Sequence, residues 1–217
     1  MSATELLILF IISLIANLLS ALAGGGAGLL QLPALLFLGL PFPTALATHK
    51  IASVALGVGA SIRHWQSEKL DVRFSLFILA AGLPGVWLGT QVILDVPEHW
   101  AKLALGILTI GIGVYSLFKP NLGQKNETRT HSFRELSIGC SVLFIIGVLN
   151  GSLTSGTGLF VTLWLIRWFG FDFTRAVAYT LILVGLFWNG VGALFLAQQT
   201  TVAWTWLPLL LLGSLVG

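Results

Sequence analysis

Two glycine-rich segments contain the polar residues of this chain that are best placed to bind a ligand. The first, Ala23–Pro33, holds four glycines within five residues, and the second, Asn150–Phe160, combines three glycines with serine and threonine hydroxyls. Glycine costs about 1 kcal/mol per residue in a helix interior relative to alanine. In a membrane, a helix break also frees backbone N–H and C=O groups that protein or a water-filled cavity must satisfy. Both segments therefore predict helix breaks that form a site.

Each break precedes a short apolar segment, so we expect each to lie at the N-terminus of a short helix. Free N–H groups and the helix dipole make such a terminus attractive to anions. We expect the two breaks to meet and form one site. The alternative is close helix packing by small residues, with hydroxyls bonded to their own backbone. The candidate substrate-binding residues in the breaks are Gly24, Gly25, Gly26, Gly28, Gln31, Asn150, Ser152, Thr154, Ser155, Gly156 and Thr157.

Three further candidates, Thr48, His49 and Lys50, are consecutive residues inside an apolar segment. Lys50 is the only Lys or Arg well inside a predicted span, where a charge is costly and usually functional. It could pair with an anionic substrate, and the alternative is that its ammonium reaches the outer interface. His49 is the one interior group that titrates near neutrality, so it could carry a coupling proton. The alternative for His49 is a hydrogen-bonded structural histidine.

Acidic residues and cysteines are scarce in the apolar segments, which disfavours several classes of site. No predicted span has an Asp or Glu away from its ends, so a carboxylate-based proton pump or cation site is not expected. The single cysteine, Cys140, excludes an intrachain disulfide, and no group of ligands has metal-binding spacing. We predict no metal, no cofactor, no catalytic residue and no enzymatic activity. A hydrolase dyad of Ser155 and His49 is an alternative that nothing else in the sequence supports.

The composition indicates the elements that must position these residues. Of the 217 residues, 56% are hydrophobic and 9% are charged, whereas soluble domains have about 25% charged residues. Several apolar runs reach the length of about 18 residues that is typical of transmembrane helices. The sequence therefore predicts an all-α, polytopic transmembrane helix bundle whose main partner is the lipid bilayer. The basic residues lie in loops, so the net charge of +3 does not indicate nucleic-acid binding.

The predicted helices include several that are too short to cross a membrane alone. At 1.5 Å per residue, a segment of about 12 residues spans about 18 Å of a hydrocarbon core about 30 Å thick. Such short or discontinuous helices are expected beside the glycine-rich breaks. The predicted spans are Leu6–Leu22, Leu29–Leu40 (short), Thr44–Ile62, Phe74–Leu94, Trp100–Phe118, Leu136–Leu149 (short), Leu159–Trp168 (short), Ala176–Ala197 and a final span that begins at Val202.

The two halves of the chain resemble each other. An offset of 130 residues places Gly26 on Gly156, and an offset of 131 places Ala45 on Ala176. The order of elements is also shared: helix, glycine break, short helix, turn, long helix. We therefore predict a first membrane repeat (1–118), a cytoplasmic linker (119–135) and a second membrane repeat (136–217). The second repeat ends earlier than the first, so we expect the chain to be truncated by about one helix.

The distribution of Lys and Arg predicts the orientation in the membrane. If each short segment counts as one crossing, nine loop charges fall on one side, which should be cytoplasmic. The N-terminus is then outside, and an odd number of crossings per repeat inverts the second repeat relative to the first. The nine residues are Arg63, Lys69, Arg73, Lys119, Lys125, Arg129, Arg134, Arg167 and Arg175.

Five segments together resemble the sulfite exporter TauE/SafE family of membrane permeases. They are Gly24–Pro33, Ala45–Ser53, Gly82–Gly89, Gly151–Gly158 and Arg175–Thr180. The resemblance covers most of the chain and rests on the order of glycine and small-residue motifs. It implies transport of sulfur-containing anions such as sulfite or sulfonates, often by export. It also implies a last helix that this sequence lacks.

We therefore expect a secondary transporter (permease) for a small, sulfur-containing anion in a bacterial inner membrane. The paired breaks, the loop charges, Lys50 and the resemblance all support this hypothesis. The alternatives are an anion channel or a non-transporting membrane scaffold. The sequence leaves the coupling ion, the direction of transport and the presence of a homo-oligomer open.

Overall fold

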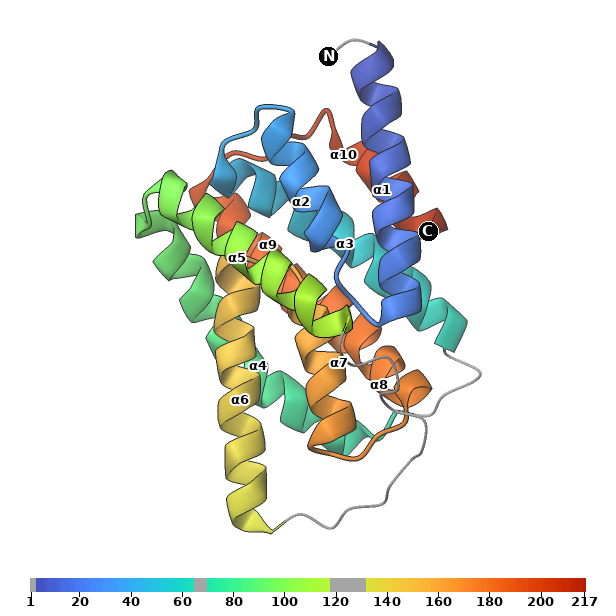
Figure 1. Ribbon diagram of the computed structural model, residues 1–217, viewed down its shortest axis with the longest axis vertical. Coiled ribbons are helices and arrows are strands. Elements are labelled where there is room, and N and C mark those ends of the chain that lie inside the picture. Colours follow the sequence, from blue (N-terminus) through green and yellow to red (C-terminus); the bar gives the residue numbers. More distant parts are fainter. Residues whose placement is uncertain (1–2, 65–69, 118–131) are drawn as a thin grey trace.

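The computed structural model describes residues 3–64, 70–117 and 132–217, and within these ranges it contains helices and turns but no strand (Figure 1). Most helices lie close to their predicted positions. Their bounds are α1 Ala3–Ala23, α2 Gly28–Phe37, α3 Phe42–His64, α4 Val72–Asp95, α5 Glu98–Leu117, α6 Phe133–Ser152, α7 Thr157–Arg167, α8 Phe173–Tyr179, the π-helical segment η1 Thr180–Trp188, α9 Asn189–Gln199 and α10 Leu207–Val216.

Five of the described helices are long and apolar enough to cross a membrane. They are α1, α3, α4, α6 and the continuous helix Phe173–Gln199, which comprises α8, η1 and α9. Among the shorter apolar helices are α2 and α7, which follow the two breaks. The predicted all-α transmembrane bundle with short helices at glycine-rich breaks is confirmed.

Two predicted boundaries are wrong. The span predicted as short, Leu136–Leu149, is a helix of 20 residues. It begins earlier because Ser132 and Glu135 form a capping box, in which each side chain binds the other residue's backbone N–H. The final helix begins at Leu207 rather than Val202. The predicted linker, 119–135, lies largely outside the described residues.

Both predicted breaks are present. α1 ends at Ala23 and α2 begins at Gly28, while α6 ends at Ser152 and α7 begins at Thr157. Gly24, Gly25 and Gly26 have φ angles of 79°, 116° and 109°. These values lie in the region that glycine adopts without steric cost and that other residues avoid. The first break therefore depends on glycine at these positions.

The helix pairs on either side of the two breaks approach from opposite ends of the molecule. α1 begins at the end marked by the N-terminus, whereas α6 begins at the far end (Figure 1). From each break the short helix, α2 or α7, turns back toward the end where its pair began (Figure 1). The loop-charge pattern requires each short helix to run back in this way, as one crossing of the membrane. The inverted-repeat relation between the two halves stays a prediction.

Glycines allow α4 and α6 to pack with their backbones in contact. A Cβ atom added at Gly147 would meet the carbonyl oxygen of Gly82, and one added at Gly151 would meet that of Val86. From the α4 side, a Cβ at Gly85 would meet the carbonyl oxygen of Phe144. Small residues at such an interface drive helix association in membranes through close contact.

We expect Gly147→Val to destabilise the protein, because its side chain would force α4 and α6 apart. Overpacking of a close interface costs about 1–3 kcal/mol. The matched control is Gly111→Val on α5, because a Cβ atom there would have no neighbour within 4 Å. Thermal unfolding in detergent should show a lower Tm for Gly147→Val than for Gly111→Val. Equal Tm values would contradict the packing argument.

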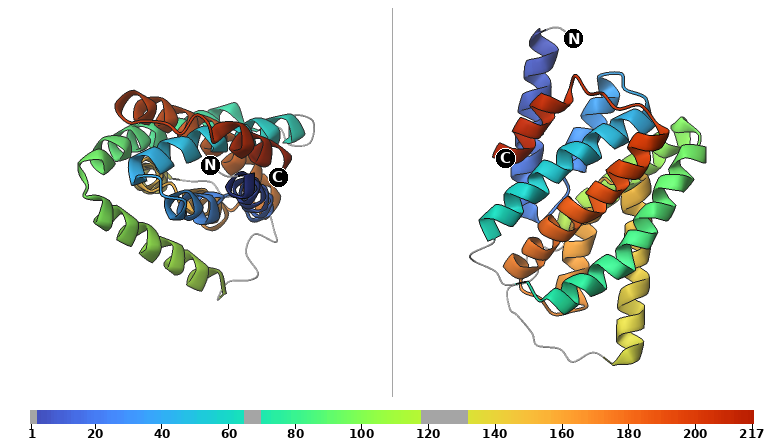
Figure 2. Two further views of the ribbon diagram at one scale, coloured as in Figure 1. Left: turned by 90° about the horizontal axis from the view of Figure 1, so that it is seen from above. Right: turned by 180° about the vertical axis from the view of Figure 1, so that it is seen from behind.

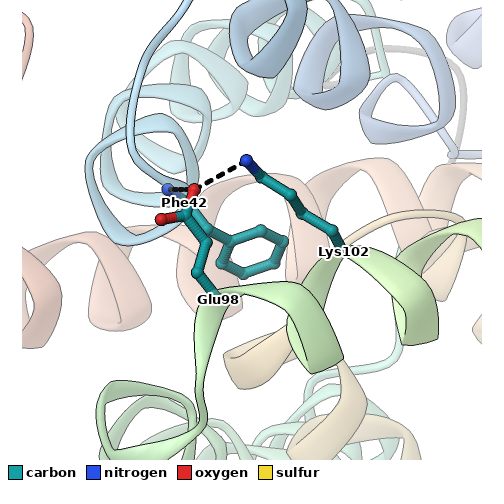
Figure 3. A network of polar contacts seen from close by, with 3 residues as sticks. All are labelled: Phe42, Glu98 and Lys102. Atoms are coloured by element: carbon teal, nitrogen blue, oxygen red, sulfur yellow. Dashed lines mark hydrogen bonds and ion pairs between the residues drawn. The ribbon is translucent and has the colours of Figure 1, made fainter.

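Helix α5 stands to one side of the bundle (Figure 2). Its first turn is fixed by Glu98, whose Oε1 accepts a hydrogen bond from the Phe42 N–H at 3.2 Å and lies 2.8 Å from Lys102 Nζ (Figure 3). A carboxylate suits this place because the first N–H groups of α3 have no partner within their own helix. Further along α5, the side chain of Ile112 lies against Gly156. Helix α5 therefore covers the second break.

Candidate functional site

The two breaks lie in direct contact. A Cβ atom added at Gly25 would lie 2.8 Å from the Cα of Gly158, and one at Gly28 would lie 3.2 Å from the Cα of Ser155. Only glycine permits this approach of two backbones. The geometry thus brings together segments that are about 130 residues apart in the sequence.

A cavity of about 40 Å³ lies where the breaks meet. A single water needs about 10–15 Å³ of such space, so the cavity has room for about three waters or one small ion. Its wall comes from α1, both breaks, α3, η1 and the start of α9. Of the candidate residues, those in the wall are Gly25, Gly26, Gly28, His49, Asn150, Thr154 and Thr157.

Lys50 is completely buried next to this cavity. Its Nζ donates to Asn150 Oδ1 at 3.0 Å and lies 3.4 Å from Asn189 Oδ1. In the described part of the chain it has no carboxylate partner. The alternative in which Lys50 reaches the membrane interface is therefore wrong. Its side chain packs against Gly192, where a Cβ atom would lie 3.0 Å from Nζ.

The Lys50 ammonium fixes the orientation of both asparagine amides. An ammonium only donates hydrogen bonds, so the Oδ1 atoms of Asn150 and Asn189 must face it. Asn150 Nδ2 then donates to Thr157 Oγ1 at 3.0 Å, and it lies 3.3 Å from Asn189 Oδ1. Asn189 Nδ2 has no hydrogen-bond partner among the described residues, although the residue is only 6% exposed and lines the cavity. Because Asn189 lines the cavity, its Nδ2 is available to donate to a ligand there.

His49 lies on the same wall and is also buried. Its Nδ1 is 2.6 Å from Gln31 Oε1, and its Nε2 is 3.3 Å from Ser53 Oγ. A nearby hydroxyl, Ser20 Oγ, lines the cavity and has no partner in the described structure. The cavity wall thus combines one imidazole, two amides and several hydroxyls.

Three candidate hydroxyls lie outside the cavity wall and have other partners. Thr48 Oγ1 accepts a hydrogen bond from the Ala203 N–H at 3.0 Å. Ser152 Oγ donates to the Val148 carbonyl at 2.8 Å, which is the backbone bonding that the alternative interpretation expected. Ser155 Oγ lies 3.4 Å from Thr109 Oγ1. His49 Nε2 contacts Ser53 rather than Ser155, so the geometry offers no hydrolase dyad.

Three other candidates do not line the cavity but contact or adjoin residues of its wall. Gln31 contacts the cavity only through His49. The Gly24 carbonyl accepts a hydrogen bond from Thr162 Oγ1 at 2.6 Å. Gly156 makes room for Ile112. These residues hold the shape of the site without facing the cavity.

Sequence reasoning missed several polar residues of the wall: Ser20, Ser53, Thr180 and Asn189. Ser53 follows His49 by four residues, so the two share a helix face. Thr180 is the position that the 131-residue offset pairs with His49. Asn189 is a polar residue inside the predicted span Ala176–Ala197, and this is the signal that could have found it.

Comparison with known protein families agrees with the sequence motifs. The model of the sulfite exporter TauE/SafE family matches residues 9–217, which is nearly the whole chain. The chain belongs to the TauE/SafE family. No solved structure matches this TauE/SafE chain.

Relatives of this TauE/SafE chain are bacterial proteins named as transporters. A probable membrane transporter protein of Haemophilus influenzae is 33% identical over 82% of this chain and 69% of the relative. The probable membrane transporter protein YfcA of Escherichia coli K12 is 27% identical over 97% of the chain and 77% of the relative. A third relative, the probable membrane transporter protein ORF9 of Sinorhizobium, is 29% identical over 85% of this chain and 69% of the relative. This TauE/SafE protein is accordingly a membrane transporter.

Proposed function

We propose that this protein is a secondary transporter of a small sulfur-containing anion, such as sulfite or a sulfonate, and that the cavity between the two breaks is its substrate site. The observation that carries this proposal is Asn189, a residue of the cavity wall whose Oδ1 lies 3.4 Å from the buried Lys50 Nζ and whose Nδ2 has no hydrogen-bond partner among the described residues. An anion accepts hydrogen bonds and balances a buried cation, so it satisfies both groups at once.

The charge distribution around the cavity favours an anion over a cation. The Lys50 ammonium binds two residues of the wall, Asn150 and Asn189, and none of the described residues in the wall is a carboxylate. The N-termini of α2 and α7 also meet the cavity, through Gly28 and through Thr157 and Gly158. Their partial positive charges add to that of Lys50. The cavity volume suits a compact anion, and the name of the family motivates sulfite.

The architecture favours a carrier over a channel. Discontinuous helices that meet at a central site are typical of secondary transporters. The side chain of Ile112 covers Gly156, so the second break is closed on the side of α5. A channel would need a continuous open path. We further propose that the protein lies in the bacterial inner membrane with its N-terminus outside, because the loop charges follow the positive-inside rule.

Sulfite counterflow in proteoliposomes tests this function. Vesicles loaded with unlabelled sulfite should accumulate radiolabelled sulfite transiently, because a carrier exchanges internal for external substrate. A channel would equilibrate the label without an overshoot, and a scaffold would match protein-free vesicles. If sulfite and a sulfonate such as methanesulfonate both fail to exchange, the proposed function is wrong.

We expect Asn189→Asp to lower sulfite exchange by more than tenfold while leaving the fold intact. Aspartate keeps an oxygen for Lys50, but its second oxygen replaces the free N–H donor and repels an anion. A hydrogen bond to a charged group is worth about 1.5–3 kcal/mol, or roughly 10- to 100-fold in affinity. The same chemical change at the exposed Gln199, Gln199→Glu, is the control and should leave exchange unchanged. If Asn189→Asp exchanges sulfite at the wild-type rate, the Asn189 amide does not bind the anion.

A further inference from the structure

We propose that the cavity also binds the coupling ion, a proton, at His49 Nε2, and that this proton moves in the same direction as the anion. The inference rests on the proposed function, because a coupling ion has meaning only if the cavity carries a substrate. The hydrogen bonds around His49 decide which of its two ring nitrogens carries the hydrogen.

A chain of hydrogen bonds from α10 to α3 fixes the tautomer of His49. Ser13 Oγ lies 3.0 Å from the Leu210 carbonyl oxygen, which can only accept, so the single Ser13 hydroxyl hydrogen points there. Ser13 Oγ must then accept from Gln31 Nε2 at 2.8 Å. The amide orientation turns Gln31 Oε1 toward His49 Nδ1, 2.6 Å away. Because Gln31 Oε1 only accepts, Nδ1 carries the hydrogen.

The remaining nitrogen, Nε2, is therefore an unprotonated acceptor in the neutral ring. It points to the glycine break, since a Cβ atom added at Gly28 would lie 3.0 Å from Nε2. Nε2 lies 3.3 Å from Ser53 Oγ, a distance longer than an ordinary hydroxyl hydrogen bond. His49 is the only titratable side chain among the described residues that line the cavity. Nε2 is thus the atom of the wall that can take up a proton.

The polar groups of the described residues that share the cavity with His49 or bind its ring are neutral. α1 contributes Ser20 and α2 contributes Gln31, while the second break and α9 contribute Asn150 and Asn189. The adjacent charge is the Lys50 ammonium, which opposes a second positive charge on His49. An anion in the cavity offsets that repulsion. Anion binding therefore favours protonation of Nε2, and by linkage protonation favours anion binding to the same degree.

The transfer balances without any further reactant. A hydronium ion on one side of the membrane gives a proton to Nε2, so that its O–H bond breaks, water remains and an N–H bond forms. The site then opens to the other side, where water takes the proton as the anion leaves. With a dianion such as sulfite, Lys50 and the protonated His49 together neutralise the loaded site.

The test measures proton movement with sulfite in proteoliposomes that contain an internal pH dye, with potassium and valinomycin on both sides. Protein-free vesicles give the passive sulfite flux to subtract. A more acidic outside should drive sulfite accumulation, about tenfold for each pH unit at one proton per anion. Sulfite uptake without a gradient should acidify the interior. Wild-type exchange that moves no protons would overturn this inference and leave the proposed function intact, whereas absence of exchange would overturn the proposed function.

The matched variants are His49→Asn in the cavity and His99→Asn at an exposed position of α5. Asparagine retains an N–H donor for Gln31 but cannot take up a proton near neutral pH. We expect His49→Asn to exchange sulfite more slowly and without proton movement, and His99→Asn to behave as wild type. Proton-coupled uptake by His49→Asn would refute the assignment.

A second variant covers the case in which His49→Asn does not fold. Gln31→Glu places a carboxylate against the Nδ1–H group, which stabilises the protonated ring. Acid-driven sulfite uptake should then continue to a higher pH than in the wild type. An unshifted pH profile would contradict a proton site on His49.

Discussion

We expect Lys50→Met to abolish sulfite exchange and to lower stability by a few kcal/mol. Methionine has a similar volume, so the substitution leaves little empty space. It removes the hydrogen-bond donor of Asn150 Oδ1 and one of the two donors of Asn189 Oδ1, which keeps Asn150 Nδ2. A buried carbonyl left without a donor costs about 1–3 kcal/mol. The substitution also removes the positive charge and frees the Asn189 amide to rotate. The anion then loses both its countercharge and a fixed donor.

The control is Lys102→Met, because Lys102 is 49% exposed and its ion pair with Glu98 lies at the surface. Surface ion pairs contribute at most about 1 kcal/mol. Counterflow and thermal unfolding should both separate the two variants. If Lys50→Met exchanges sulfite at the wild-type rate, Lys50 has no role in anion binding and the site must be sought elsewhere.

The second large effect is expected for Gly25→Ala, which adds one methyl group where the breaks touch. Two costs apply. The φ angle of 116° is strained for any residue with a Cβ, by about 1–2 kcal/mol. The new Cβ would also lie 2.8 Å from the backbone of Gly158, which can move only if the breaks separate. We expect loss of exchange together with a clear fall in Tm.

Gly39→Ala is the control that carries only the first cost, the backbone strain, so its comparison with Gly25→Ala shows the effect of the contact between the breaks. Gly39 also has a positive φ, 93°, but a Cβ atom there would meet nothing within 4 Å. It should lose stability through backbone strain alone and retain sulfite exchange. If Gly39→Ala and Gly25→Ala behave alike in both assays, contact between the breaks does not matter for function.

The breaks could be found from the sequence because their signal is local. Consecutive glycines are poor helix formers wherever they occur, so Gly24–Gly28 marks a break without knowledge of its neighbours. Lys50 and His49 could be found for a similar reason, since charge and titratable groups are rare inside apolar segments. Among the described residues, the short helices α2 and α7 and the long apolar spans followed from the length of the apolar segments.

What the sequence could not provide was the direction of each side chain. Successive residues on a helix point about 100° apart, and in the structure His49 lines the cavity whereas Thr48 accepts a hydrogen bond from the Ala203 N–H. The Ser152 hydroxyl donates to the Val148 carbonyl of its own helix and so does not reach the cavity. Asn189 gains its role only when Lys50 and Asn150 approach it from two other helices. The π-helical segment η1, which supplies Thr180 to the wall, has no comparable local signal.

The partners of Lys50 have an electrical consequence. Because its ammonium rests on neutral amides in the described structure, the empty site carries one uncompensated positive charge. A site loaded with a dianion and a proton is neutral. For a carrier of this kind, the membrane potential acts on the return of the empty site rather than on the passage of the loaded one. An inside-negative potential, worth about 2.3 kcal/mol per charge for each 100 mV, would draw the empty site toward the cytoplasm.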